Sequence, residues 1–260
     1  MGVSTTASKN QRIDANPKRD FVLDEVAALN AEFEGRDARE VLKWAVDHLH
    51  PRVALATSFQ AQGMVLIDMI MDISRDARIF TLDTGRLNQE TYDVMDEVRK
   101  RYGVNVEVLF PDAHDVEEMV REKGANLFYY GKANRIHCCD IRKVRPLRKY
   151  LLGLDAWITS IRRDQTESRA QAERFEIDAQ HGGILKINPL VDWTNDEVWA
   201  YIRKNRVPYN KLHDMGYPSI GCAPCTRAVK PGEDERAGRW WWESGSDKEC
   251  GLHFSHKEDS

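Results

Sequence analysis

Five cysteines are the residues of this chain whose types and spacing most clearly suggest chemistry. Cys138 and Cys139 are adjacent, Cys222 and Cys225 form a Cys-x-x-Cys motif, and Cys250 stands alone near the end of the sequence. Four thiolates are the number that a structural zinc ion or an iron–sulfur cluster requires. A single further thiol is what a nucleophile requires. This division into four and one favours an enzyme.

The first four cysteines favour an iron–sulfur cluster over zinc. Structural zinc sites usually combine two knuckles in which a few residues separate the cysteines, so an adjacent pair fits one tetrahedral ion poorly. A [4Fe–4S] cluster offers four iron corners, which neighbouring residues can bind separately. Buried thiols without a ligand are the alternative for isolated cysteines. A pair followed by a Cys-x-x-Cys motif makes metal or cluster binding the better interpretation.

Cys250 lies in the sequence Lys-Glu-Cys-Gly-Leu-His. Cationic neighbours lower the pKa of a thiol, so His253 and a cationic active site would favour the nucleophilic thiolate. Gly251 would leave the adjacent backbone conformationally free. From the local sequence alone, a surface cysteine without a function is an equal alternative.

Two further features indicate an anionic ligand. The loop of residues 58–63, Ser-Phe-Gln-Ala-Gln-Gly, joins an expected strand to an expected helix, where backbone N–H groups can bind phosphate or sulfate. It does not follow the Walker A pattern. Between Arg135 and Lys149 there are six lysines and arginines but one acid, in a chain whose net charge is −4. Arginine matches oxyanions through paired hydrogen bonds, so these cations suggest a local anion site.

The rest of the sequence alternates strand-like and helix-like segments. Helices are expected at residues 21–33, 38–50, 64–73, 89–102, 116–123 and 195–205, the last with Thr194 as its N-cap. Strands are expected at residues 52–59, 78–84, 104–110, 156–161 and 184–190. This alternation predicts the α/β class with a doubly wound, mainly parallel sheet. Ligands of such sheets bind at the carboxyl ends of the strands.

The composition fits one large α/β domain with an irregular appendage. Of the 260 residues, we expect a polar tail over residues 1–20, a nucleotide-binding domain over residues 21–207 and a C-terminal segment over residues 208–260. The sequence has no apolar stretch of membrane-spanning length and no signal peptide. An odd number of cysteines without an export signal favours the cytoplasm. The net charge argues against a nucleic-acid partner.

Five longer motifs together resemble the assimilatory sulfonucleotide reductases. They are Cys-Cys-Asp-Ile-Arg-Lys-Val-Arg-Pro-Leu, Arg-Arg-Asp-Gln-Thr, Pro-Leu-x-x-Trp-Thr-x-x-Glu-Val-Trp, Ser-Ile-Gly-Cys-x-Pro-Cys-Thr-Arg and Glu-Cys-Gly-Leu-His. Within this family the chain is similar to the iron–sulfur branch, the adenylyl-sulfate (APS) reductases. The resemblance runs from about Arg52 to His253. It implies a pyrophosphatase-loop fold, related to the adenine-nucleotide α-hydrolases, with the nucleotide above the carboxyl ends of the sheet.

The resemblance also implies roles for individual residues. The ligands of a [4Fe–4S] cluster would be Cys138, Cys139, Cys222 and Cys225, and the catalytic cysteine would be Cys250. The family's phosphate loop corresponds to Ser58, Phe59 and Gln60, and its nucleotide motif to Leu82, Asp83, Thr84 and Gly85. The basic positions that line the substrate pocket would be Lys143, Arg162, Arg163, Arg236, Arg239 and His253. The phosphate loop here departs from the glycine-rich form, which fits a loss of ATP hydrolysis.

The family's reaction gives these residues a mechanism. The Cys250 thiolate would attack the sulfur of APS, expel AMP and form an S-sulfocysteine, from which thioredoxin or a similar dithiol donor would release sulfite for cysteine biosynthesis. Because an anion attacks an anion, Lys143 and the arginines would offset the negative charge. The donor supplies both electrons, so we expect an electrostatic and structural role for the cluster. A homo-oligomer remains an open possibility.

Three alternatives stay open at this point. The first is the same reaction on the 3′-phosphorylated nucleotide, PAPS, alone or together with APS; the four cysteines favour APS. The second is an ATP-using adenylyltransferase or pyrophosphatase on the same fold, against which the nucleophile-like Cys250 argues. The third is a cluster-bearing sensor or a zinc-stabilised binding module, for which the sequence offers no DNA-binding helix pair or basic arm.

Overall fold

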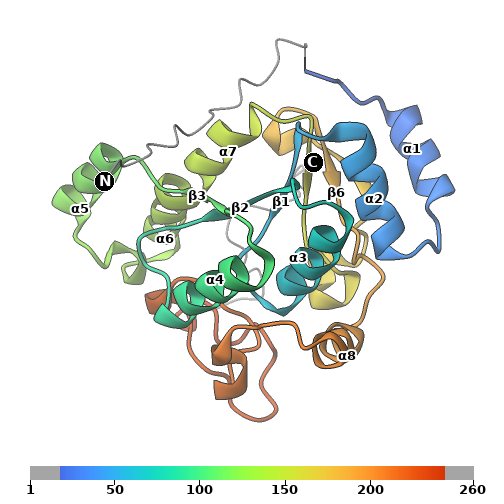
Figure 1. Ribbon diagram of the computed structural model, residues 1–260. Coiled ribbons are helices and arrows are strands. Elements are labelled where there is room, and N and C mark those ends of the chain that lie inside the picture. Colours follow the sequence, from blue (N-terminus) through green and yellow to red (C-terminus); the bar gives the residue numbers. More distant parts are fainter. Residues whose placement is uncertain (1–17, 244–260) are drawn as a thin grey trace, which may run out of the picture.

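One six-stranded sheet organises the computed structural model, which describes residues 18–243 (Figure 1). Its strands lie in the order β3-β2-β1-β4-β6-β5, and only the β5–β6 pair is antiparallel. The strands are β1 (Val53–Ala56), β2 (Arg78–Leu82), β3 (Glu107–Leu109), β4 (Ala156–Ile158), β5 (Phe175–Asp178) and β6 (Ile184–Ile187). The predicted mainly parallel, doubly wound sheet is therefore confirmed. The chain moves outward from β1 to β3 and returns on the other side at β4, so the topological switch point lies between β1 and β4.

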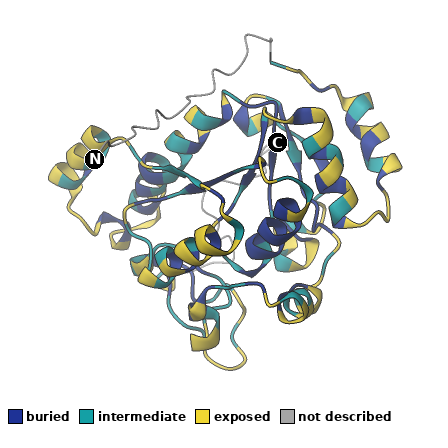
Figure 2. Ribbon diagram, viewed as in Figure 1, coloured by how far each residue is buried: buried dark blue, intermediate teal, exposed yellow. Residues whose placement is uncertain are grey.

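Helices cover both faces of this sheet (Figure 1). The larger core cluster is formed by one face and by α1 (Leu23–Glu32), α2 (Ala38–Leu49), α3 (Ala61–Ile73), α4 (Gln89–Tyr102) and α8 (Asn195–Asn205). The opposite face packs against α7 (Arg145–Leu151). A third cluster joins α5 (Ala113–Lys123) and α6 (Lys132–Cys139) to the C-terminal segment. Buried residues, dark blue in Figure 2, are concentrated in the central strands and in α3.

The strand sequences explain why both faces are buried. In β1, Val53 and Leu55 face the larger core cluster, whereas Ala54 and Ala56 face the α7 side. Side chains alternate between faces along a strand, so an uninterrupted apolar run is what a sheet covered on both sides requires. The same alternation places Ala156 and Ile158 of β4 in one cluster and Trp157 in the other.

Helix ends follow local sequence signals. The predicted bounds of α4 and α8 agree with the structure, and Thr194 is the N-cap of α8, where its side chain accepts a hydrogen bond from the Glu197 N–H. The Glu197 carboxylate accepts the Thr194 N–H in return, which completes a capping box. Gly103 ends α4 with a φ of 68°, a left-handed conformation that favours glycine.

The sequence did not predict two longer stretches of regular structure. The antiparallel edge strand β5 is one, and the helical stretch of residues 132–151 is the other. This stretch consists of α6, a π-helical turn (Asp140–Val144) and α7 in direct succession. The π turn begins immediately after Cys139, and such turns occur frequently at functional sites.

The described part of the C-terminal segment packs against the carboxyl ends of the strands. Residues 206–243 contain only two short 3-10 helices, Lys211–Met215 and Ala223–Cys225, and one isolated bridge between Thr226 and Arg239. The Ile220 N–H donates to the Gln60 side chain at 2.8 Å, and the Ala223 N–H donates to the Arg86 carbonyl at 2.8 Å. The domain boundary at residue 207 stays a prediction. Among the described helices, none has the length and apolar character needed to cross a membrane.

Candidate active site

A cavity of about 740 Å³ opens where the parallel strands end. Its walls come from the loops after β1, β2 and β4 and from the C-terminal segment. Its floor is apolar and includes Phe80, Leu147 and Trp157 on the α7 side of the sheet. An apolar floor with polar groups at the rim is typical of a small-molecule site, and its place at the carboxyl ends is the one expected for this fold.

Most of the described residues that the sequence predicted to bind substrate line this cavity. They are Ser58, Gln60, Leu82, Thr84, Lys143, Arg162, Arg236 and Arg239. Four others, Phe59, Asp83, Gly85 and Arg163, lie beside the cavity but outside its lining. Cys250 and His253 fall outside the described residues, so their predicted roles stay predictions.

Phe59 anchors the loop after β1 instead of facing the cavity. Its side chain is completely buried in the larger core cluster, and its φ of 55° lies in the left-handed region that bulky residues rarely adopt. The Phe59 N–H donates to the Thr57 hydroxyl at 3.0 Å. This reversal leaves Ser58 and Gln60 on the cavity side of the loop.

Asp83 and Gly85 shape the loop after β2. The Asp83 carboxylate accepts hydrogen bonds from the Gly85 N–H at 2.7 Å and from the Tyr92 hydroxyl at 3.1 Å. Burial, followed by the contact with Asp83, raises the pKa of Tyr92 to about 12, so this hydroxyl remains a donor at neutral pH. Gly85 has a φ of 70°, which completes the tight turn and presents Thr84 to the cavity.

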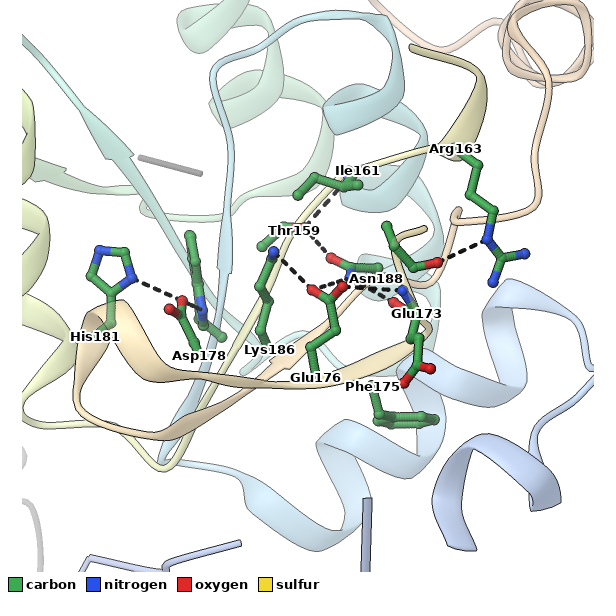
Figure 3. A network of polar contacts seen from close by, with 12 residues as sticks. Thr159, Ile161, Arg163, Glu173, Phe175, Glu176, Asp178, His181, Lys186 and Asn188 are labelled. Atoms are coloured by element: carbon green, nitrogen blue, oxygen red, sulfur yellow. Dashed lines mark hydrogen bonds and ion pairs between the residues drawn. The ribbon is translucent and has the colours of Figure 1, made fainter. Parts of the chain in front are cut away.

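Arg163 points away from the cavity. Its guanidinium donates to the Ala172 carbonyl at 2.8 Å (Figure 3) and forms an ion pair with Asp192. The neighbouring Arg162 does line the cavity, with its side chain 3% exposed, and pairs with Asp164 at 3.0 Å. Burial lowers the pKa of Arg162 from its usual value. The two adjacent arginines therefore have different positions although the sequence predicted one role for both.

A buried polar network holds the loop after β4 (Figure 3). The Thr159 hydroxyl donates to Asn188 Oδ1 at 2.5 Å, and Asn188 Nδ2 donates to the Glu173 carbonyl at 2.7 Å and to Glu176 at 3.1 Å. Lys186 pairs with Glu176 at 2.8 Å. Because Thr159 lines the cavity, β5 and β6 support this wall through Asn188.

Arg239 occupies a tightly built position at the opposite wall. Its guanidinium donates to the Ser219 hydroxyl at 3.2 Å, and the side chain is buried. A Cβ atom added to Gly221 would lie 2.5 Å from Arg239 Nη2, so a larger residue there would force this guanidinium to shift. The cavity thus carries fixed positive charge supplied by the C-terminal segment.

The four described cysteines line a second, much smaller cavity of about 20 Å³. Cys138 and Cys139 end α6, whereas Cys222 precedes and Cys225 ends the 3-10 helix Ala223–Cys225. Four cations share this lining: Arg86, Arg135, Arg142 and Lys143. Of the described residues, Lys143 alone lines both cavities. It therefore stands between the thiols and the larger site.

The thiols differ in their ease of ionisation. Burial raises the pKa of Cys138, and it raises the pKa of Cys225 to about 12. Burial also opposes ionisation of Cys222, but Lys143, a 3.2 Å hydrogen bond with Thr84, and Arg239 together lower the pKa of its thiol below the usual value. Of Cys138, Cys222 and Cys225, Cys222 is accordingly the thiol that ionises most readily.

Four thiols line one small cavity with cations beside them, a donor set of the kind that can hold a metal group. Among residues 18–243, no three His, Cys, Asp or Glu side chains lie close enough together to hold one metal ion. The iron–sulfur cluster expected from the sequence therefore stays a prediction.

The sequence missed three arginines of the cysteine cavity, Arg86, Arg135 and Arg142. Arg142 is buried and donates to the Thr84 carbonyl at 2.6 Å, and Arg86 donates to Asn126 at 3.0 Å beside the cysteines. The cation-rich run around the cysteine pair contained Arg142 but did not distinguish it from its neighbours. Arg86 carried no signal, because only the fold brings the loop after β2 to the end of α6.

Comparison with known proteins agrees with this arrangement. Residues 52–228 match the phosphoadenosine phosphosulfate reductase domain. The adenosine 5′-phosphosulfate reductase of Burkholderia cepacia is 46% identical over 229 residues, which cover 88% of this chain and 91% of that protein. The enzyme of the same name from Allochromatium vinosum is 49% identical over 201 residues, covering 77% of this chain and 78% of that one.

Solved structures extend the comparison to the fold. The phosphoadenylyl-sulfate (PAPS) reductase of Candida auris, in a phosphate complex, superposes with a TM-score of 0.70 at 29% identity, covering 82% of this chain and 100% of that one. The FMN adenylyltransferase of Candida glabrata has a TM-score of 0.50 at 13% identity, covering 93% of this chain and 78% of that one, and shares the fold alone. From the domain match and the near-full-length relatives, the chain belongs to the phosphoadenosine phosphosulfate reductase family, the sulfonucleotide reductases.

Proposed function

We propose that this protein is an APS reductase, which converts adenylyl sulfate to sulfite and AMP in sulfate assimilation. The observation that carries the proposal is the position of Lys143, which lines both the cation-rimmed cavity and the cavity of four thiols. A sulfate anhydride is the kind of ligand that such an arrangement can hold, since its charged end needs cations and its nucleotide needs an apolar floor. The near-full-length relatives that bear this name support the assignment.

The larger cavity offers separate places for the parts of the substrate. The floor formed by Phe80, Leu147 and Trp157 suits the adenine ring, because aromatic and aliphatic side chains bury a planar base. Arg236, Arg239 and Lys143 suit the phosphate and sulfate groups, which guanidinium and ammonium groups bind through charge-assisted hydrogen bonds. These cations would also stabilise the charge that gathers on the departing phosphate.

Cys138, Cys139, Cys222 and Cys225 would hold a [4Fe–4S] cluster. When bound, this cluster would supply electrostatic and structural support beside the sulfate, not electrons for each turnover. The protein's own residues also act on these thiols. Lys143, a hydrogen bond with Thr84, and Arg239 lower the pKa of the Cys222 thiol, against the effect of burial. Lys143 then extends the same positive charge toward the substrate cavity.

Cys250 would be the nucleophile. Its thiolate attacks the sulfate sulfur, the bond between that sulfur and the phosphate oxygen breaks, and AMP leaves with the electron pair. A thiolate of a dithiol donor, thioredoxin or a similar protein, then attacks the Cys250 sulfur and releases sulfite. The second donor thiol resolves the mixed disulfide, so the donor is oxidised and Cys250 returns to the thiolate. The reaction requires a reducing compartment, which the cytoplasm provides.

Product formation from three nucleotides tests the proposal. Sulfite and AMP should form in equal amounts from APS when a dithiol donor is present, and kcat/KM for APS should exceed that for PAPS at least tenfold. Equal or faster turnover of PAPS would show that the protein is a PAPS reductase or a dual reductase instead. The similar structure from Candida auris bears the name PAPS reductase. Consumption of ATP without any thiol would instead support an adenylyltransferase.

A further inference from the structure

Arg135, Trp240 and Glu243 form a buried cluster, here called the clamp, at the point where the chain continues toward Cys250. We propose that the Arg135–Glu243 ion pair is a positioning pair, which fixes where the segment after Glu243 begins and thereby presents Cys250 to the substrate. The inference rests on the proposed role of Cys250 as nucleophile. It assigns no catalytic contact to the pair itself.

The ion pair joins residues that are far apart in the sequence. Arg135 Nε donates to Glu243 Oε1 at 2.6 Å, and the two side chains are 1% and 10% exposed. Surface ion pairs contribute little, but removing one partner of a buried pair leaves an uncompensated charge inside the protein. The position of Glu243 relative to α6 is therefore strongly determined.

Trp240 packs against Arg135 of this pair. Its ring is buried, and the guanidinium carbons of Arg135 and Arg239 lie 4.4 and 4.6 Å from the ring centroid. Its φ of 41° falls in the left-handed region, which a bulky residue keeps only where the surrounding structure imposes it. The Trp240 N–H donates to the Cys225 carbonyl at 3.1 Å, and the Glu243 N–H donates to the Trp240 carbonyl at 2.9 Å.

The clamp therefore lies beside both cavities. Arg135 lines the cysteine cavity and stands three residues, about one helical turn, before Cys138. Arg239, on the other side of Trp240, lines the substrate cavity. Cys250 follows Glu243 by seven residues, which span at most about 25 Å when extended. With so short a segment, the place of Glu243 limits which points Cys250 can reach.

Attack by Cys250 on a bound substrate is an intramolecular step, so its rate depends on how often the thiolate is held near the sulfur. If Glu243 is held less firmly, the Cys250 thiolate is near the substrate sulfur less often, although the substrate cavity itself does not change. A clamp that only stabilised the fold would act differently, because its loss would lower stability and disturb the thiols. The two roles can thus be separated by measuring Cys250 and the four other cysteines independently.

Glu243→Gln is the decisive variant, because it keeps the shape of the side chain and a hydrogen-bond acceptor but removes the charge. Asp115→Asn is the matched control, since it removes the charge from a partly exposed arginine pair, Arg145–Asp115 at 2.8 Å, that lies outside both cavities. Single-turnover transfer of sulfur label from APS to Cys250 should be at least tenfold slower in Glu243→Gln. APS affinity should stay within twofold, iron–sulfur absorbance should be unchanged, and alkylation of Cys250 by iodoacetamide without substrate should be at least threefold faster.

Label transfer within twofold of the wild type would overturn the inference. Slow transfer accompanied by lost iron–sulfur absorbance would overturn it as well, because the pair would then belong to the scaffold of the cysteine cavity. Arg135→Lys, which keeps the charge but not the planar fork, should give an intermediate rate. If the wild type takes up no label, the proposed function fails, whereas unchanged alkylation of Cys250 in Glu243→Gln contradicts the clamp alone.

Discussion

Replacing Asn188 should disrupt the wall of the substrate cavity from behind. Asn188 is completely buried at the carboxyl end of β6 and does not itself line the cavity. It accepts a hydrogen bond from Thr159 and donates to the Glu173 carbonyl and to the Glu176 carboxylate. Asn188→Ala removes all three bonds and leaves the buried Thr159 hydroxyl without its acceptor.

The expected loss of stability follows from these bonds. A neutral hydrogen bond contributes about 1 kcal/mol and a bond to a charged group about 1.5–3 kcal/mol, so the three together contribute about 3–5 kcal/mol. Asn205→Ala is the control. Its Nδ2 donates one bond, to the Tyr201 carbonyl at 3.0 Å, at the exposed end of α8, so its loss should be below about 1 kcal/mol.

Urea unfolding, followed by tryptophan fluorescence, measures both variants. Asn188→Ala should lower the transition midpoint while the slope of the free energy against urea stays constant, since the surface exposed on unfolding hardly changes. The APS affinity of the folded variant should also decrease, because Thr159 loses its acceptor at the cavity wall. A loss of stability below about 1 kcal/mol would show that Asn188 does not hold this network together.

Three further predictions concern other sites. Lys143→Met should lower kcat/KM for APS by about 10²–10³-fold with the fold intact, as expected for the loss of a charge that stabilises the transition state. Steady-state kinetics measure this effect, and a change below threefold would contradict the prediction. Asp68→Ala should lower the free energy of unfolding by about 3 kcal/mol or more, as measured by urea titration. The reason is that the hydroxyls of Tyr102 and Tyr201, 2.7 and 2.8 Å from the Asp68 carboxylate, lose their charged acceptor. A loss below about 1 kcal/mol would refute this prediction. Burial lowers the pKa of His213, so the unfolded chain takes up a proton more readily than the folded protein as the pH falls below about 6.5. The free energy of unfolding should then decline toward acidic pH, and His213 should contribute no more than about 1.4 kcal/mol per pH unit to that decline. His213→Gln should make the decline less steep. Equal pH dependence of the two proteins in urea titrations would contradict this prediction.

The sequence predicted those elements whose packing gives a regular apolar pattern. The buried strand around Val53 and Leu55 reads as an apolar run, and the bounds of α4 and α8 follow from Gly103 and Thr194. Strand β5 was missed because Phe-Glu-Ile-Asp is short and half polar, as suits an antiparallel edge. Its pairing with β6 is a tertiary contact that local propensity does not reveal.

The helix α6 was missed for a different reason. Its buried positions are Arg135 and Cys138, so the helix lacks the apolar face by which amphipathic helices are recognised. These positions are buried against the other cysteines and Trp240, a contact that forms only when the C-terminal segment folds back. Residue types thus indicated which cysteines lie together. The positions of the cations beside these cysteines follow from the fold and could not be predicted.

Phe59 and Arg163 show the limit of transferring roles by motif position. Both stand beside residues that do line the cavity, yet a left-handed φ turns Phe59 into the core and a contact with Asp192 draws Arg163 outward. A motif specifies a stretch of chain, whereas the backbone conformation of each residue decides where its side chain points.

The mass of Cys250 after a single turnover shows whether this thiol is the nucleophile. The protein should be incubated with APS in the absence of any dithiol donor, digested, and examined by peptide mass spectrometry. We expect one added SO₃ group on the peptide that contains Cys250, its removal by thioredoxin together with sulfite release, and no addition to Cys250→Ser. An SO₃ group on another residue, or sulfite release by Cys250→Ser, would contradict the proposed mechanism.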